Sequence, residues 1–392
     1  MMKHQEHLSE LLRNRRCTLL NIGPMSQNCV DAVIELAREL RLPLGLIASR
    51  RQIEAAAHGG GYVNNWTTET FAEYVRAKDP ERTVFLARDH GGPWQNYAEV
   101  KGKMNLAQAM ESAKSSFETD IRAGFDMLHL DPSIDIHKTP TQTEILERLF
   151  ELYEFCHAKA RENNADLMYE FGTDEQSGDQ QDLAEFEDLI QKLLAFCEKN
   201  NYPKPFFVVV QTGTKVKELR NVGNIGANDA PKGLIPPKVY VRKLVEICNR
   251  YGLHLKEHNA DYLSDDILAW HPRVGIHAIN VAPEFGVCET RHILDLCDQF
   301  DLRKEKERFL EMAYNSKKWD KWLIPDSTAT DDEKAAMAGH YVFALPEFLE
   351  LKQAIAAQCM KRRVDLDFSI RQGLKFSIMR YIYHLNLHHG YH

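Results

Sequence analysis

The chain has 392 residues, of which 44% are hydrophobic and 27% charged, so it is long enough to bury a large core. Its net charge of −8 argues against a general affinity for nucleic acid, although a local cluster of Arg and Lys would still hold a small anion. Residues 1–16 are charged rather than apolar, and no apolar run reaches the roughly 20 residues that span a bilayer, so neither a signal peptide nor a membrane protein is expected.

Short apolar runs of strand length recur along the chain. They are Cys17–Gly23, Pro43–Ser49, Thr83–Arg88, Phe125–Leu130, Ala165–Phe171, Pro205–Val210, His254–Glu257 and Val274–Val281. Most neighbouring runs are separated by segments with helical 3.6 periodicity, namely Cys29–Leu40, Thr67–Ala77, Leu106–Ala123, Thr141–Asn163, Asp182–Lys199 and Pro237–Tyr251. Alternating strands and helices predict a parallel sheet, and eight such units predict an α/β fold of the closed (β/α)₈ (TIM) barrel type.

The seventh connection, Ser264 to Arg273, is short and is the weakest point in this pattern. After about Cys297 the pattern becomes helical without strands, with expected helices at Lys304–Trp322, Asp331–Met337, Pro346–Lys361 and Asp365–His384. We therefore expect a barrel with the active site in residues 1–298 and a helical extension packed on it in residues 299–392. The extension could also form a contact between subunits.

Eight cysteines are scattered along the chain without any Cys-x-x-Cys pair. Several of them, such as Cys17 and Cys156, lie in apolar runs. This pattern favours reduced core thiols in a cytoplasmic protein over a disulfide framework.

Polar residues follow most of the expected strands, at the end of a barrel where active sites form. His90, Glu170 and His258 follow or end the third, fifth and seventh strands. Two imidazoles and a carboxylate are the ligand types of a catalytic metal site with an open position. They predict a divalent metal, with Zn²⁺ preferred and Mn²⁺ or Co²⁺ able to serve the same geometry. A single strand-end histidine is more often structural, and the prediction depends on finding the three together.

Two carboxylates are expected to transfer protons. Asp89 adjoins a proposed ligand at a strand end, where the backbone turns and both side chains can reach the same pocket. Asp174 lies in the polar run after the fifth strand. The alternative for Asp89 is a solvated strand-end residue or a helix cap.

Eight further residues are expected to contact substrate at the same rim: Arg50, Gln52, Gly60, Gly61, Asp131, Gln211, Asp261 and Asn280. Arg50 and Arg51 would bind an anionic group, and the glycines would let the backbone approach a ligand closely. The Gly- and Asn-rich loop after Thr212 is either a mobile lid or a plain connector.

Several short motifs resemble, in the right order, the D-tagatose-bisphosphate aldolase Z-subunit family, whose members are often called non-catalytic subunits. The resemblance runs from about Asn21 to Gly286. The motifs are a Gly-Gly-Tyr segment ending at Tyr62, Asp89-His90-x-Gly92-Pro93, Ala123-Gly124-Phe125, His129-Leu130-Asp131, Gly172-Thr173, Val209-Val210-Gln211 and Glu257-His258-x-x-Asp261-Tyr262.

The wider class II fructose-bisphosphate aldolases are similar at a greater distance. That resemblance implies that Asp89 is the catalytic acid and that His90, Glu170 and His258 are metal ligands. Gln211 stands where those aldolases have a further histidine ligand. Their phosphate-binding Gly-Gly-Ser-type loop is absent after His258.

The resemblance implies a metal-dependent aldolase that cleaves or forms a carbon–carbon bond in a ketose or ketose phosphate. Re-addition of the released aldehyde on its other face would make the same machinery a C4 epimerase. A third alternative is an accessory subunit that stabilises a separate aldolase. The expected partners are a small sugar or sugar phosphate and either further copies of the chain or an aldolase subunit, with no nucleic acid and no membrane.

Overall fold

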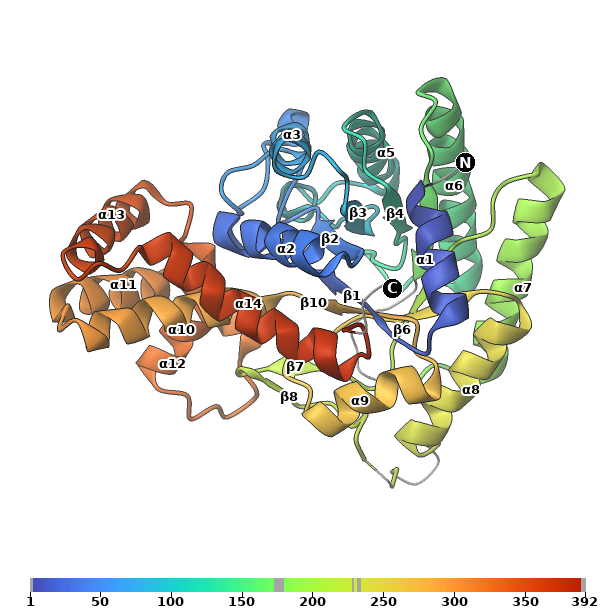
Figure 1. Cartoon of the computed structure of the whole chain (residues 1–392). Coiled ribbons are helices and arrows are strands. Elements are labelled where there is room, and N and C mark those ends of the chain that lie inside the picture. Colours follow the sequence, from blue (N-terminus) through green and yellow to red (C-terminus); the bar gives the residue numbers. More distant parts are fainter. Residues whose placement is uncertain (1–2, 173–179, 228, 231–233, 389–392) are drawn as a thin grey trace.

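The computed structural model describes residues 3–172, 180–227, 229–230 and 234–388, and its centre is a closed barrel of eight parallel strands (Figure 1). In chain order these strands are β1 (Leu19–Ile22), β2 (Leu44–Ser49), β3 (Val84–Gly91), β4 (Met127–Leu130), β5 (Met168–Gly172), β6 (Phe207–Val210), β9 (His254–Glu257) and β10 (Ala278–Val281). The barrel closes where β1 pairs with β10, Leu19 lying opposite Ala278. The (β/α)₈ barrel expected from the sequence is confirmed.

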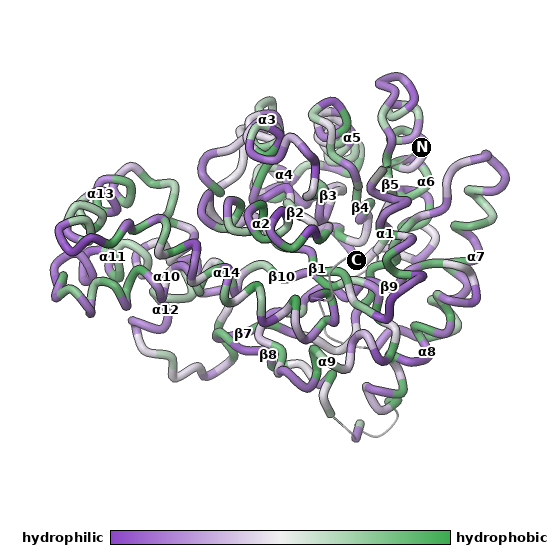
Figure 2. The backbone as a smooth tube through the Cα atoms, viewed as in Figure 1, coloured by the Kyte–Doolittle hydropathy of each residue, from purple (hydrophilic) through white to green (hydrophobic). Residues whose placement is uncertain are grey.

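Helices cover the outside of the barrel, as expected for parallel strands joined by crossovers. Those that follow the strands are α2 (Gln27–Leu40), α3 (Thr68–Lys78), α5 (Leu106–Arg122), α6 (Gln142–Glu162), α7 (Leu183–Asn200), α8 (Pro237–Arg250), α9 (Asp265–Val274) and α10 (Pro283–Gln299). Hydrophilic and hydrophobic residues alternate along them, for example in α6 and α7 (Figure 2). One face of each helix can therefore pack on the strands while the other faces water.

Capping residues fix where several helices begin. Thr67, Asn105 and Thr141 accept a hydrogen bond from the backbone three residues on, and the residue at that position bonds back to the cap. Such a capping box satisfies two backbone donors that the first helical turn leaves unpaired. The helix starts are thus specified locally, before any packing on the barrel.

Both ends of the chain add helices to the barrel. The helix α1 (Lys3–Asn14) precedes β1, and its His4 ring lies 6.1 Å from the Phe85 ring of β3. The extension contains α11 (Arg303–Asn315), α12 (Asp331–Ala338), α13 (Pro346–Met360) and α14 (Leu366–His384), together with the short 3-10 helices η2 (Asp320–Trp322) and η3 (Gly339–Tyr341). The helices α11, α12 and α13 lie to one side of the barrel, and α14 returns to pack on α2, α9 and α10 (Figure 1).

Several expected boundaries differ from those observed. The short seventh connection does contain a helix, α9, which completes the eighth strand–helix unit. The eighth strand begins at Ala278 rather than at Val274, because residues 265–274 belong to that helix. The helix expected at Lys304–Trp322 ends at Asn315, and η2 follows as a separate turn.

All eight cysteines are free thiols, which agrees with the absence of a disulfide framework in the sequence pattern. Among the described residues, no helix is both long and apolar enough to cross a bilayer.

Candidate active site

The end of β3 turns sharply and brings two consecutive side chains to one cavity. The β3–β4 register shifts between Arg88 and Gly91, and His90 adopts the left-handed conformation with φ of 45°. A non-glycine residue in that conformation costs on the order of 1–3 kcal/mol and persists only where its surroundings hold it. Gly92 allows the close approach that follows, since a Cβ there would lie 1.9 Å from the Asp131 carbonyl oxygen. Asp89 and His90 consequently both line the cavity.

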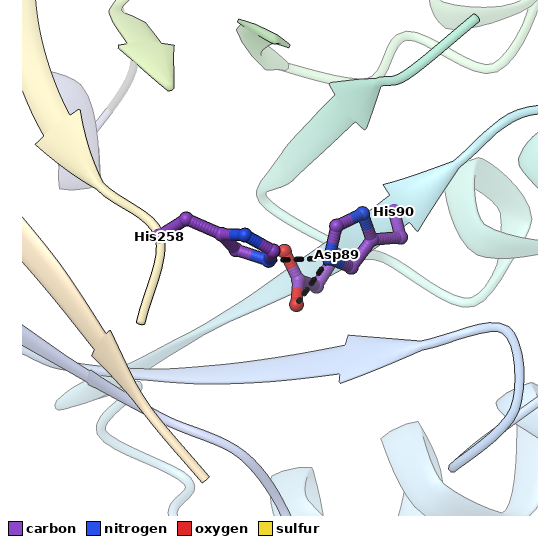
Figure 3. A group of neighbouring side chains, drawn as sticks. All are labelled: Asp89, His90 and His258. Atoms are coloured by element: carbon purple, nitrogen blue, oxygen red, sulfur yellow. Dashed lines mark hydrogen bonds and ion pairs between the residues drawn. The ribbon is translucent and has the colours of Figure 1, made fainter. Parts of the chain in front are cut away.

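Asp89, His90 and His258 converge at the carboxyl ends of β3 and β9 (Figure 3). Each offers a ligand atom, and these atoms all lie within 4.8 Å of one another. The His90 Nε2 faces the His258 Nε2, and the Asp89 Oδ2 lies 4.0 Å from His90 Nε2. Burial alone would raise the pKa of Asp89, but the neighbouring imidazoles of His90, His129 and His258 lower it, so its carboxylate is the stable form.

Asp131 orients His90 from behind. Its Oδ2 lies 2.7 Å from His90 Nδ1 and accepts a hydrogen bond of 2.7 Å from Gln95 Nε2. Although burial opposes it, the contact with His90, the nearby His129 and the contact with Ser133 lower the pKa of Asp131. A carboxylate that holds the far nitrogen of an imidazole leaves the near nitrogen available as a metal ligand. Asp131, expected to contact substrate, lines the cavity and also has this positioning contact.

Glu170, expected as the third ligand, has a different set of neighbours. Both of its oxygens accept hydrogen bonds from Lys256 Nζ, at 2.8 and 2.7 Å, and one lies 3.5 Å from His129 Nδ1. It groups with Asp89 and His129 as a second possible ligand set, not with His90 and His258. Glu170 lies opposite His129 in the β4–β5 register, so its side chain lies beside that of His129. The carboxylate that groups with the two facing imidazoles as a possible ligand set is that of Asp89.

The donor set at this point suits a divalent cation. Two imidazole nitrogens and a carboxylate oxygen within one small volume match the ligands of Zn²⁺ and related ions. All three side chains are largely buried. His90, His258 and Asp89 are therefore one set of residues able to hold such an ion, and Asp89, His129 and Glu170 are the other among the described residues.

The cavity at this end of the barrel has a volume of about 300 Å³. Barrel loops supply most of its lining, including Gln52 after β2 and Gln95 after β3. The helical extension supplies the rest, namely Lys321, Trp322, His340 and Tyr341. These four residues were not identified from the sequence, because no strand-end pattern marks them and only the tertiary packing brings them to the barrel rim.

Two other expected substrate residues lie beside Asp89 or in the cavity wall. The Gln52 Oε1 accepts from the Ser49 backbone N and hydroxyl, and the residue lines the cavity. The Asn280 Nδ2 lies 3.4 Å from Asp89 Oδ1, as does His129 Nδ1 on the same oxygen. Asn280 thus contacts Asp89 but does not line the cavity.

The remaining expected substrate residues take part in contacts within the chain. Arg50 is buried and paired with Glu54 and Glu99, at 2.7 Å each. Gln211 accepts from the backbone N of Gly213 and Thr214. Asp261 accepts from the backbone N of Ala282 and Glu284 at the start of α10.

The paired glycines also serve the chain itself. A Cβ on Gly61 would lie 1.9 Å from the Gln52 carbonyl oxygen, so this glycine permits two backbone segments to meet. Gly60 and Gly61 line a neighbouring pocket that shares Arg51, Tyr62, Tyr97 and Tyr341 with the main cavity. Asp174 lies outside the described residues.

The loop after β6 contains a short hairpin, β7 (Val216–Lys217) with β8 (Arg220–Asn221), which touches the extension. The Lys217 Nζ donates to the Lys321 carbonyl oxygen and the Glu218 backbone N donates to that of Trp322. The described part of the loop is thus joined to the same extension segment that lines the cavity.

The fold resembles that of several solved structures. A probable tagatose 6 phosphate kinase from Sinorhizobium meliloti 1021 aligns over 94% of this chain and 100% of its own, with a TM-score of 0.72 and 14% identity. A fructuronate-tagaturonate epimerase, UxaE from Cohnella laeviribosi, aligns over 94% and 81% with a TM-score of 0.57 and 11% identity. A fructose-bisphosphate aldolase from Campylobacter jejuni aligns over 97% and 94% with a TM-score of 0.54 and 10% identity. At such low identity these likenesses describe the fold alone.

A sequence match covers the part of the chain that contains β1 to β5 and the Asp89-His90 turn. Residues 7–187 are similar to the family described as D-tagatose-1,6-bisphosphate aldolase subunit GatZ/KbaZ-like, which confirms the expected resemblance over that part of the chain; the motifs at residues 209–211 and 257–262 lie beyond the match.

Proposed function

We propose that this protein is a metal-dependent enzyme of the class II aldolase type that cleaves or forms a carbon–carbon bond in a ketose or ketose phosphate. The observation that carries the proposal is the convergence of Asp89, His90 and His258 in a cavity at the catalytic end of the barrel. The family match over residues 7–187 supports the sugar substrate class.

In this proposal His90 and His258 hold the ion, and Asp131 keeps the His90 ring in place. A divalent ion there supplies Lewis-acid stabilisation for negative charge on the ketose carbonyl oxygen. Zn²⁺ is the preferred ion because imidazoles dominate the ligand set. Glu170 would reach the ion only by exchanging its contact with Lys256.

Asp89 moves the proton in the bond-breaking step. Its carboxylate takes the proton of the C4 hydroxyl, the C3–C4 bond breaks, and C4 leaves as an aldehyde while the electron pair passes to the ketose carbonyl oxygen. The Asp89 Oδ1 is held by His129 and Asn280, which leaves Oδ2 directed at the imidazoles. The low pKa of Asp89 keeps it in the carboxylate form that accepts a proton.

One observation favours a C4 epimerase as the second candidate. The extension walls the cavity with Lys321, Trp322, His340 and Tyr341. A walled cavity would retain the aldehyde between bond cleavage and re-formation, so that it could turn and be attacked on its other face. An open rim would instead release it as a product.

Metal analysis together with a substrate screen tests these candidates. The purified protein is expected to contain about one divalent ion per chain, and His258→Ala is expected to lose it. Incubation with ketoses and ketose phosphates, followed by NMR, then separates the aldehyde product of an aldolase from the C4 epimer. A protein without metal and without turnover would instead support an accessory subunit that acts with a separate aldolase.

We also propose a cytoplasmic location, which the eight free thiols support because such thiols persist in a reducing compartment.

A further inference from the structure

Two cations, Arg51 and Lys321, line the cavity that also contains the Asp89 cluster, and a third, Lys318, lines the neighbouring pocket. All three lie against aromatic rings. The Arg51 guanidinium lies 4.7 Å from the centre of the Tyr97 ring, and Lys318 Nζ lies 5.3 Å from the same ring. The Lys321 Nζ lies 5.2 Å from the Tyr341 ring. Arg51 comes from the loop after β2, whereas the two lysines come from the extension. The cation group is therefore built by two distant parts of the chain.

Among the described residues, these cations have no acidic partner within ion-pair distance. In the part of the chain that the structure describes, no ion pair joins Arg51, Lys318 or Lys321 to a carboxylate. The adjacent Arg50 differs, because Glu54 and Glu99 neutralise it. Partial removal from water lowers the pKa of Lys321, and the positive charges of Arg51 and Lys318 add to this effect. The wall thus carries positive charge that nothing in the described chain offsets.

A short chain of contacts connects this wall to the imidazole pair. The Arg51 Nε donates to the Gln95 carbonyl oxygen at 3.2 Å, and the Gln95 Nε2 donates to Asp131, which holds His90. Arg51, Lys321, Asp89, His90 and His258 all line one cavity of about 300 Å³. A single small molecule can therefore contact both groups.

His340 gives the extension side of the cavity a second unpartnered polar group. It is 2% exposed, lines the cavity, and neither of its ring nitrogens has a hydrogen-bond partner. Burial, with the nearby Lys321 charge, lowers the pKa of His340 to about 3, so the ring is neutral. A buried imidazole without partners loses free energy unless a ligand supplies a hydrogen bond. A sugar hydroxyl in the cavity would supply one.

We propose that Arg51 and Lys321 bind the anionic end of the sugar substrate, a phosphate ester or a carboxylate, while its carbonyl end faces Asp89, His90 and His258. This assignment rests on the proposed function for the identity of the substrate as a sugar. Guanidinium and ammonium groups are the usual protein ligands of phosphate and carboxylate. The helical extension is then part of the substrate site, and it selects charged sugars over neutral ones.

The direct test measures binding of inorganic phosphate and of acetate by calorimetry, with no turnover required. Lys321→Met and Arg51→Met, which keep much of the apolar stem, are expected to weaken binding of the preferred anion about tenfold each. Lys317→Met is the matched control, since Lys317 carries the same charge in the same segment but stacks on Tyr314 outside the cavity. A preference for phosphate identifies a phosphate ester as the substrate group, and a preference for acetate identifies a carboxylate.

Unchanged anion affinity in both Lys321→Met and Arg51→Met would overturn the assignment, as would a wild-type protein that binds neither anion. Turnover gives an independent readout. If the enzyme acts on a charged sugar, Lys321→Met is expected to raise KM with little change in kcat. Unaltered KM with intact turnover would refute the anion site and leave the proposed function standing. If Lys321→Met and Arg51→Met lose anion binding while the wild-type protein turns over no sugar, the anion site stands and the proposed function is refuted.

Discussion

Two buried charge clusters lie on opposite sides of strand β3 and differ in how well their members are paired. Outside the barrel, Arg88 donates to both oxygens of Asp120 at 2.8 and 2.6 Å, and to the carbonyl oxygens of Ala48 and Ile53. Inside the cavity, the neighbouring Asp89 has longer hydrogen-bonding contacts, at 3.4 Å to both His129 and Asn280. Two consecutive residues thus carry a fully paired charge and a loosely held one.

This difference indicates which buried charges stabilise the fold and which are available to bind a ligand. A buried ion is tolerated when its hydrogen bonds are complete, and its loss leaves a partner charge exposed to a low-dielectric interior. A buried ion with long or missing contacts is available for chemistry. By this criterion Arg88, Asp120 and Arg50 support the fold, while Asp89 is available for chemistry.

The largest effect is expected for Asp89→Asn, on turnover. The amide keeps the size of the side chain but cannot accept the proton, so kcat is expected to fall by about 10²–10⁴. The check is steady-state kinetics on the sugar identified by the screen, together with metal analysis and a denaturation curve. Stability is expected to stay close to that of the wild type because the contacts of Asp89 are weak.

Metal content decides how a slow Asp89→Asn variant is understood. Content near that of the wild type supports proton transfer by Asp89. Loss of the ion would make Asp89 a ligand, and the proton would then have to move through Asp131 or Asp174. Normal turnover of Asp89→Asn would show that Asp89, like Arg88, has no role in catalysis.

The next effect is expected for Arg88→Met, on stability. Removing the guanidinium leaves Asp120 buried without its partner, and breaking a buried pair in this way costs about 3–5 kcal/mol of unfolding free energy. Urea denaturation measures it. Arg122→Met is the matched control, because the exposed Arg122–Glu118 pair is expected to contribute less than about 1 kcal/mol. Equal losses in the two variants would break the comparison.

The third effect is expected for Asp261→Asn; it is small near pH 5 and grows as pH rises. Burial and the neighbouring Glu284 raise the pKa of Asp261 to about 8, well above the unfolded value of about 3.9. The folded protein therefore retains a proton that the unfolded chain loses, so wild-type stability falls as pH rises between those two values. Asn accepts the same two backbone hydrogen bonds without this dependence.

Stability curves at several pH values check the Asp261 prediction. The variant is expected to gain about 1.4 kcal/mol relative to the wild type for each pH unit between pH 5 and pH 8, since each pKa unit corresponds to about that amount. Parallel pH profiles for the two proteins would show that Asp261 is ionised when folded. Loss of substrate binding in Asp261→Asn would instead support the substrate contact that the sequence predicted for Asp261.

Much of the barrel and part of the site could be predicted from the sequence. Strand periodicity and the rule that strand ends carry the chemistry located Asp89, His90 and His258. The partner of Glu170 could not be predicted, because Lys256 lies in an apolar run and its direction depends on strand register. The sequence also could not show that Arg50 is paired with acids whereas Arg51 lines the cavity. Glu54 and Glu99 come together with Arg50 only in the folded chain.

The extension shows the limit of sequence patterns most clearly. Lys321 and His340 reach the cavity from helical segments whose periodicity indicates only burial and exposure. Nothing local marks them, because their position depends on how α10, α11 and η3 pack together. Residues that join a site from a distant segment need the fold before they can be recognised.

Residues 385–386, which follow α14, contact the segment just before β1 and so join two parts of the chain that are distant in sequence. The Thr18 backbone N donates to the Leu385 carbonyl oxygen, Asn386 Nδ2 donates to the Arg16 carbonyl oxygen, and α14 packs on α2. The barrel closes where β1 pairs with β10, directly after the segment that residues 385–386 contact. Fraying of α14 would therefore loosen the chain next to the seam of the barrel, far from α14 in sequence.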